Sequence, residues 1–259
     1  MFDKTRDVAQ YIIDPIMFLA LVGCHGIMTF FFLLIHFRFD TLFSISKFKD
    51  VWFARFWAVY GPQLAQGPGR DRVRLLTPEV TGVVLDIGPG TGEWLELLDS
   101  SKLTKVYGVE PNADHYARLR EHIKEAGLAD IYEIIPAGVE DLSKYGIELE
   151  SVDTILTLQC LCSVPNQRQM IRDLYQYLKP NGGKWVLYEH VVTKQTGIIA
   201  MYQATIDLVW PHFLGGCSIT RNTEKNLREA GEWNKIDLKQ PAEEPIYHMV
   251  PHVGGVLVK

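Results

Sequence analysis

Residues 83–94 have the sequence Val-Val-Leu-Asp-Ile-Gly-Pro-Gly-Thr-Gly-Glu-Trp, an apolar run followed by a turn with three glycines. The apolar run predicts a buried strand over residues 83–87, and the turn is expected to lead into a helix over 91–100. Glycines allow the backbone to bend sharply and to lie close to a ligand. The stretch therefore predicts a cofactor site of the nucleotide type at the carboxyl end of a strand.

The glycine spacing distinguishes this turn from the Gly-x-Gly-x-x-Gly turn of dinucleotide-binding proteins. The third glycine, Gly92, falls one position early, and Glu93 stands where that glycine is expected. The next strand ends in Glu110, whose carboxylate is placed to accept hydrogen bonds from both hydroxyls of a ribose. An adenosine cofactor other than NAD is favoured, and an NAD-dependent enzyme, for which no hydride-transfer dyad is recognisable, is a lesser alternative.

The chain after the glycine turn alternates between strand and helix patterns. Further strands are expected over residues 105–110, 131–136, 152–158, 184–190, 235–238 and 253–258, and helices over 112–126, 166–178 and 198–213, with one more helix capped by Thr220 or Asn222. This alternation predicts an α/β domain with a mostly parallel sheet and helices on both faces. Ligands of such sheets bind beyond the carboxyl ends of the strands.

The order of these motifs resembles the class I S-adenosylmethionine (SAM) methyltransferases. The glycine turn with Asp86 is similar to the family's first motif, residues 109–112 to its second-strand acid, 137–141 to its adenine loop, 152–159 to its fourth strand, and 178–190 to its fifth strand with the preceding turn. The resemblance covers residues 76–259. It implies a Rossmann-like sheet of seven strands with an antiparallel C-terminal strand, and SAM as the cofactor.

The resemblance also implies which residues bind SAM, and an aromatic residue of the lead-in segment is added to them as a cover for the cofactor. The expected cofactor-binding residues are Tyr60, Asp86, Gly88, Pro89, Gly90, Gly92, Glu110, Pro111, Asn112, Gly138, Val139, Glu140, Leu158 and Gln159.

Four short segments, residues 160–164, 189–191, 216–221 and 251–254, are similar to a membrane-associated branch that includes animal alkyl-thiol methyltransferases. The chain departs from that branch at Tyr188, where tryptophan is common, and at Pro89 inside the glycine turn. The lead-in at residues 52–57 is more similar to fungal O-methyltransferases of secondary metabolism. The acceptor atom, sulfur or oxygen, is therefore left open.

Methyl transfer from a sulfonium requires a bound donor, a desolvated site and an aligned acceptor, and no covalent catalyst. His190, at the end of the fifth strand, and His212, in the segment expected to form a lid, are the candidate catalytic residues, with His252 as a further candidate. Each could instead have a structural role. Arg221 could stabilise an anionic acceptor or pair with Glu224.

Residues 15–37 are apolar and contain no charge, and a helix of this length would be roughly 34 Å long, enough to cross a bilayer. We expect residues 1–14 to be an N-terminal tail, 15–37 a retained membrane anchor, 38–75 an aromatic, amphipathic linker or lid, and 76–259 the catalytic domain. The alternative is a helix packed on the domain or lying in the membrane interface. The basic residues that follow favour a cytosolic domain at the endoplasmic reticulum; they are Arg38, Lys47, Lys49 and Arg55.

The composition limits the partners. The 259 residues are 47% apolar and carry a net charge of −5 with no cluster of basic residues, which disfavours a nucleic-acid partner. The four cysteines show no metal-binding spacing, so no metal is expected. Cys160 and Cys162 alternate along a strand end and would point to opposite faces.

These observations predict a membrane-tethered, SAM-dependent methyltransferase for a small lipophilic molecule. The first expectation for the acceptor is the oxygen of an acidic enol or phenol in a polyketide-type secondary metabolite, and the alternative is an alkyl thiol. An alternative of another class is a non-catalytic membrane interaction protein with a SAM-binding fold. The intact glycine turn and Glu110 argue against that alternative.

Overall fold

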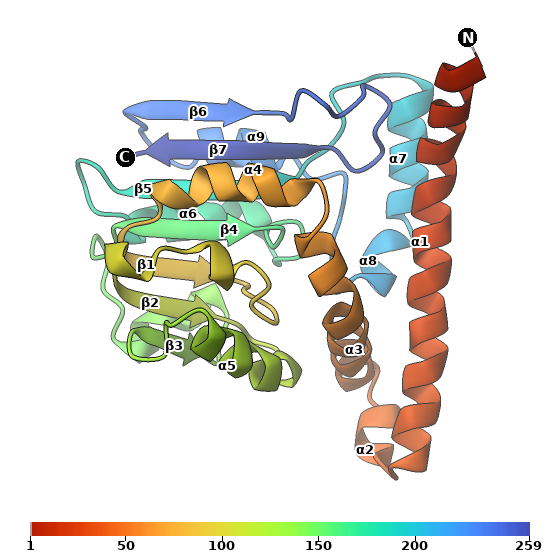
Figure 1. Cartoon of the computed structure of the whole chain (residues 1–259), viewed down its shortest axis with the longest axis horizontal. Helices are drawn as coiled ribbons and strands as arrows, with labels where there is room; N and C mark the ends of the chain where they lie inside the picture. Colours follow the sequence, from red (N-terminus) through yellow and green to blue (C-terminus); the bar gives the residue numbers. More distant parts are fainter. Residues whose placement is uncertain (1) are drawn as a thin grey trace.

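The computed structural model describes residues 2–259, which are built around one seven-stranded sheet (Figure 1). The strands are β1 (Gly82–Ile87), β2 (Leu103–Val109), β3 (Tyr132–Ile135), β4 (Thr154–Leu158), β5 (Lys184–His190), β6 (Lys235–Lys239) and β7 (His252–Val258). Their order across the sheet is β3-β2-β1-β4-β5-β7-β6. Strands β1 to β5 are parallel, and β7 is antiparallel to both β5 and β6. The predicted sheet, including its antiparallel C-terminal strand, is confirmed.

Helices cover both faces of this sheet. They are α1 (Phe2–Ile35), α2 (Phe39–Leu42), α3 (Ile45–Ala65), α4 (Gly69–Leu76), α5 (Tyr116–Glu125), α6 (Gln167–Tyr177), α7 (Ile198–Asp207), α8 (Trp210–Phe213) and α9 (Thr223–Arg228). Successive residues of β1 belong to different cores: Val84 packs with α4 and α5, and Leu85 packs with α6 and α9. Burial of both faces explains why this strand is apolar on both sides apart from Asp86.

The prediction of a helix over residues 91–100 is wrong. Two short 3-10 turns, Leu95–Leu97 and Ser100–Lys102, replace it. Gly92 has a φ of +87°, which prevents a helix from starting in the glycine turn, and Leu98 is extended, which separates the two 3-10 turns. The irregular path buries Trp94, Leu95 and Leu98 together against the sheet.

The other expected helices are present with changed limits. The stretch expected as one helix over residues 198–213 is divided into α7 and α8, and the helix after Arg221 has Asn222 at its N-cap position without a side-chain capping bond. Helix α1 begins at Phe2, so residues 2–14, which we expected to be a tail, belong to the same helix as the apolar segment.

Helix α1 runs along the edge of the domain at the carboxyl ends of the parallel strands (Figure 1). Its inner face packs against α3 and α8: a Cβ on Gly26 would lie 2.8 Å from the Trp52 ring, and one on Gly23 would lie 3.4 Å from Phe213. The Trp52 indole donates a hydrogen bond of 2.9 Å to the carbonyl of Val22. The span Gln10–Ile35 is long and apolar enough to cross a membrane, and most of it is uncovered by the domain.

Candidate active site

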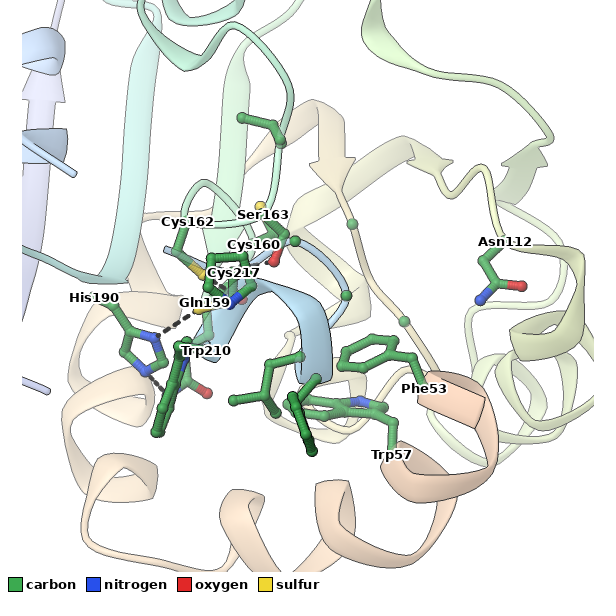
Figure 2. A pocket seen from close by; sticks show the side chains of 18 of the residues that line it. Phe53, Trp57, Asn112, Gln159, Cys160, Cys162, Ser163, His190, Trp210 and Cys217 are labelled. Atoms are coloured by element: carbon green, nitrogen blue, oxygen red, sulfur yellow. Dashed lines mark hydrogen bonds between the residues drawn. The ribbon is translucent and has the colours of Figure 1, made fainter. Parts of the chain in front are cut away.

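A cavity of about 1290 Å³ lies at the carboxyl edge of the sheet, enclosed by α1, α3, α8 and the loop before β7. It collects twelve of the fourteen expected cofactor-binding residues and both candidate catalytic histidines. Those lining it are Tyr60, Gly88, Pro89, Gly90, Glu110, Pro111, Asn112, Gly138, Val139, Glu140, Leu158, Gln159, His190 and His212. Figure 2 shows the part of this cavity where α3, the loop after β4 and the end of β5 face one another.

The glycine turn adopts a backbone that only glycine takes readily. Gly88 and Gly90 have φ values of +64° and +58°. A Cβ on Gly88 would lie 2.8 Å from the Cβ of Cys160, closer than real side chains approach. The N–H of Gly90 donates to Oε2 of Glu110 at 3.0 Å, which ties the turn to the end of β2.

Glu110 is buried at the floor of the cavity. Its Oε1 accepts a 2.8 Å hydrogen bond from the N–H of Asn112, so both of its oxygens are oriented by backbone donors. Burial raises the pKa of Glu110 to about 7, although the two backbone hydrogen bonds oppose that shift. Carboxylate oxygens accept hydrogen bonds from hydroxyl groups, as a ribose would require.

Asp86 and Gly92 are the two expected cofactor residues that do not line the large cavity. The hydroxyl of Tyr132 donates to Oδ2 of Asp86 at 2.8 Å, and burial raises the pKa of this carboxyl to about 7. Asp86 therefore links β1 to β3 beneath the glycine turn.

An aromatic wall faces the glycine turn. Phe53 and Trp57 of α3 stack with centroids 5.7 Å apart, and Phe18 of α1 lies 4.8 Å from Tyr60 and 5.5 Å from Trp210. A Cβ on Gly90 would lie 3.2 Å from the indole nitrogen of Trp57. The cavity is consequently enclosed by apolar rings on the side opposite the strand ends.

The two candidate catalytic histidines differ in their surroundings. Nδ1 of His190 lies 3.8 Å from Sγ of Cys217, and its Nε2 lies 3.4 Å from Nε2 of Gln159 (Figure 2). Burial lowers the pKa of His190, but the adjacent Cys162 and nearby carboxylates outweigh this effect and raise it above its usual value. His212 lies on α8 with its side chain exposed at the cavity wall.

His252, the further candidate, is held on two sides. Its Nδ1 lies 2.5 Å from Oε1 of Glu244, and its ring stacks on Tyr188 with an interplanar angle of 6°. Burial lowers the pKa of His252 to about 4 despite the carboxylate, so the imidazole is neutral at physiological pH. With Nδ1–H directed to Glu244, Nε2 carries the lone pair of a proton acceptor. Sequence reasoning missed Glu244, because it lies in a loop without any recognised motif.

Arg221 neither faces the cavity nor pairs with Glu224. Its guanidinium donates to the carbonyls of Leu161 and Val164, while Glu224 pairs with Lys194 and Arg228. Arg221 therefore holds the loop that follows β4.

That loop brings a cysteine into a group that sequence spacing did not indicate. Sγ of Cys162, a ring nitrogen of His190 and Sγ of Cys217 all lie within 4.8 Å of one another. Cys160 points away from this group, with Sγ 3.7 Å from a buried oxygen of Glu189. The three residues are far apart along the chain, so a search for closely spaced ligands could not find them.

The methyltransferase domain family matches residues 60–212, more than half of the chain. The chain belongs to this family. The methyltransferase thus has the SAM-dependent activity that the motif order predicted, and its glycine turn and the acid at the end of β2 line the same cavity. The expectation of a SAM-dependent enzyme is confirmed.

Curated relatives of this methyltransferase include two thiol S-methyltransferases. Thiol S-methyltransferase TMT1B of Rattus norvegicus is 29% identical over 182 residues, which cover 70% of this chain and 71% of the relative. Thiol S-methyltransferase TMT1A of Homo sapiens is 25% identical over 218 residues, which cover 83% and 87%. The names of these relatives give sulfur as the acceptor of those enzymes, whereas we expected first an enol or phenol oxygen; a role in secondary metabolism is not confirmed.

Solved structures agree on the fold. A putative O-methyltransferase from Nostoc punctiforme has a TM-score of 0.55 with 15% identity, over 80% of this chain and 60% of that chain. A geranyl diphosphate methyltransferase in complex with GPP and sinefungin has a TM-score of 0.54 with 13% identity, over 73% of this chain and 77% of that chain.

Proposed function

We propose that this methyltransferase transfers the methyl group of SAM to the sulfur of a small lipophilic thiol at a membrane surface. The observation that carries the proposal is the combination, in one apolar cavity, of the Glu110 carboxylate with a neutral histidine oriented by a carboxylate, His252–Glu244. The match to thiol S-methyltransferases supports sulfur as the acceptor.

The residues of the cavity fit SAM. Glu110 would accept hydrogen bonds from the ribose hydroxyls, and Gly88 and Gly90, where a Cβ would crowd Cys160 or Trp57, would let the backbone approach the cofactor. The adenine would lie against the loop at residues 138–140, and the methionine part against Leu158 and Gln159 at the end of β4. Tyr60 and the α3 rings would exclude water from this pocket.

Bound SAM supplies a methyl group on a sulfonium, which is displaced in line by a nucleophile. The residues of this chain have to hold the acceptor and take its proton. A thiol, with a pKa of about 8.5, gives up its proton far more easily than an aliphatic alcohol. A single neutral imidazole is therefore a strong enough base to remove it. Nε2 of His252 would accept the thiol proton, and Glu244 would stabilise the imidazolium that forms. We assign the base to His252 because Glu244 orients its ring through Nδ1, whereas Nδ1 of His190 faces the thiol of Cys217; Nε2 of each histidine lies 3.4 Å from the amide nitrogen of Gln159.

The outer surface favours a membrane beside the cavity. Large apolar side chains are exposed on α1, on either side of α2, and on and directly after α7; they include Ile13, Met17, Ile27, Phe31, Phe37, Phe43, Ile198, Met201 and Leu208. Tyr202 of α7 donates a hydrogen bond to the carbonyl of Ile12, which joins the two helices. Because α1 is packed on α3 and α8, we infer that it lies in the membrane interface with this face towards lipid, the alternative to a spanning anchor.

The same arrangement would let a lipophilic substrate reach the cavity, which α1 lines, from the membrane without passing through water. The basic residues Arg38, Lys47, Lys49 and Arg55 flank the apolar helix and favour the cytosolic face, and we propose the endoplasmic reticulum as the membrane.

A competition assay tests the acceptor. The detergent-solubilised protein is given SAM and an equimolar mixture of an alkyl thiol, a phenol and an enol with hydrocarbon parts of equal size, and the methylated products are separated by mass. The proposal predicts the thioether as the main product. A methyl ether as the main product would contradict the proposal and support an oxygen acceptor. The absence of any product together with normal SAM binding would favour the non-catalytic alternative.

A further inference from the structure

We propose that Cys162, His190 and Cys217 bind a zinc ion whose fourth coordination position opens into the cavity. This site goes beyond the methyl transfer itself, and its use by a substrate thiol rests on the function proposed above. The three residues come from the loop after β4, the end of β5 and the loop after α8 (Figure 2). All three line the cavity, so a ligand bound there would be accessible to a substrate.

The distances suit a tetrahedral ion. Zinc binds thiolate sulfur at about 2.3 Å and imidazole nitrogen at about 2.0–2.1 Å, which places neighbouring ligand atoms about 3.5–3.8 Å apart. Nδ1 of His190 lies 3.8 Å from Sγ of Cys217, and no pair in the group of three exceeds 4.8 Å. Side-chain movements that shorten these separations by at most about 1.3 Å would therefore complete the site.

The backbone holds the two cysteine loops against each other. The N–H of Ser218 donates to the carbonyl of Cys162 at 2.9 Å. Gly216 has a φ of +84°, and a Cβ there would lie only 3.3 Å from the carbonyl oxygen of Ser163. Glu189 adds a second restraint, because its carboxylate accepts the N–H groups of Cys160 and Leu161 at 3.2 and 3.1 Å.

Gln159 is placed to orient the histidine ligand. Its Nε2 lies 3.4 Å from Nε2 of both His190 and His252, and its Oε1 is buried and has no hydrogen-bond partner among the described residues. A half-turn of the amide would direct Oε1 to the Nε2–H of His190 and, once Nε2 of His252 has accepted a proton, to that nitrogen as well. The imidazole would then present the lone pair of Nδ1 to the metal, the arrangement that ligating histidines usually adopt.

The donor set suggests what the ion would do. Two thiolates, one imidazole and an open fourth position form the ligand set of catalytic zinc, and zinc prefers sulfur over an alcohol oxygen. A substrate thiol would bind in the fourth position as the thiolate, and its proton would pass to Nε2 of His252. The sulfur would then form its bond to the methyl carbon while the bond from that carbon to the sulfonium breaks, which yields S-adenosylhomocysteine and a thioether. The uncharged thioether is a poor zinc ligand and would leave.

Cobalt substitution tests the site without relying on activity. The full chain is purified under reducing conditions, freed of metal with a chelator and titrated with Co²⁺, whose bonds to thiolates give intense charge-transfer absorption. We expect one equivalent of cobalt to bind, zinc to displace it, and the absorption to be lost in Cys162→Ser and Cys217→Ser. Cys160→Ser is the matched control, because that buried thiol lies outside the group of three, and it should retain the signal. SAM binding of each variant reports whether it is folded.

The outcomes separate the site from the function. Cobalt binding that Cys162→Ser and Cys217→Ser leave intact, or no binding by a protein that still binds SAM and methylates thiols, would overturn the zinc site and leave the function standing. A Cys162–Cys217 disulfide in the reduced, SAM-binding preparation would also overturn it. One-to-one metal binding without methylation of any thiol would support the site and reject the proposed acceptor. A thioether yield that falls at least tenfold on zinc removal and returns with zinc would support both.

Discussion

The carboxylate of Glu110 accepts a hydrogen bond from the backbone N–H of Gly90 at 3.0 Å, so the acid that ends β2 and the turn that ends β1 form one unit. Neither part would bind the cofactor alone: the glycines provide the space, and the carboxylate provides the acceptors. The position of a ribose is thereby defined before the cofactor arrives. Such preorganisation strengthens binding because less conformational freedom is lost when the cofactor binds.

Replacement of Glu110 with alanine should weaken SAM binding at least tenfold, equivalent to a loss of about 1.4 kcal/mol, because the ribose hydroxyls would lose their acceptor. Isothermal titration calorimetry measures this effect. Glu96→Ala is the control, since that carboxylate is exposed and pairs with Arg70 outside the cavity. Equal affinities of the two variants would contradict the assignment of Glu110.

Two glycines with the same backbone conformation should respond differently to alanine. Gly127 has a φ of +69° and open space around its missing Cβ, so Gly127→Ala should cost only about 1 kcal/mol of conformational strain. Gly88→Ala would add a clash with Cys160 and should cost about 2–4 kcal/mol and abolish SAM binding. Urea unfolding gives both values. If the two variants are equally stable, a Cβ on Gly88 does not clash with Cys160, and the glycine turn is more loosely packed than the 2.8 Å separation indicates.

The buried Asp86 should make the stability depend on pH. Its pKa is raised from 3.8 to about 7 by burial, so the folded state holds a proton that the unfolded state releases, and stability is lost as the pH rises from about 4 to about 7. Asp86→Asn removes this titration. Its stability relative to the wild type should therefore improve by about 2–3 kcal/mol between pH 5 and pH 8, measured by urea unfolding at both values. A constant difference would show that Asp86 does not hold this proton.

The His252–Glu244 pair should matter most for weakly acidic substrates. His252→Gln should lower kcat for an alkyl thiol about 10²-fold and have a much smaller effect on an aromatic thiol that is already ionised, because only the former needs a base. Glu244→Gln should act in the same direction with a smaller loss. If His212→Gln shows the larger loss instead, the base lies on α8 and not at the start of β7.

The apolar outer face should govern membrane binding without affecting the cofactor. Met201→Glu on α7 and Leu208→Glu directly after it place charges on side chains that are 65% and 74% exposed. We expect the double variant to lose most of its flotation with phospholipid vesicles while it binds SAM normally. Unchanged flotation would mean that α1 alone anchors the protein, as a spanning helix would.

The sequence was sufficient to predict the features that depend on local pattern. The apolar run at β1, the acid at the end of β2 and the glycine spacing each carry a signal within a few residues, and the sheet and the cofactor cavity follow from their order. The helix expected over residues 91–100 failed because the φ of Gly92 and the burial of Trp94 override helix propensity.

The features that depend on distant residues could not be predicted. The pairing of Glu244 with His252 arises in an irregular loop, and the meeting of Cys162 with Cys217 depends on how the loop after α8 folds back onto β4. The packing of α1 on the domain likewise depends on the close contact of Gly26 with the Trp52 ring. These residues lie on two different helices, and no local pattern indicates that the helices meet.

The central claim is that this chain moves a methyl group from SAM to sulfur. The most direct test supplies SAM with a deuterium-labelled methyl group and an alkyl thiol to the purified protein, and examines the product by mass spectrometry. The account predicts a thioether that carries all three deuterium atoms, and its absence with Gly90→Arg, whose side chain would fill the space beside Trp57. If the thiol is recovered unchanged, and the phenol or enol of equal size supplied in a parallel reaction carries the label, the central claim is contradicted.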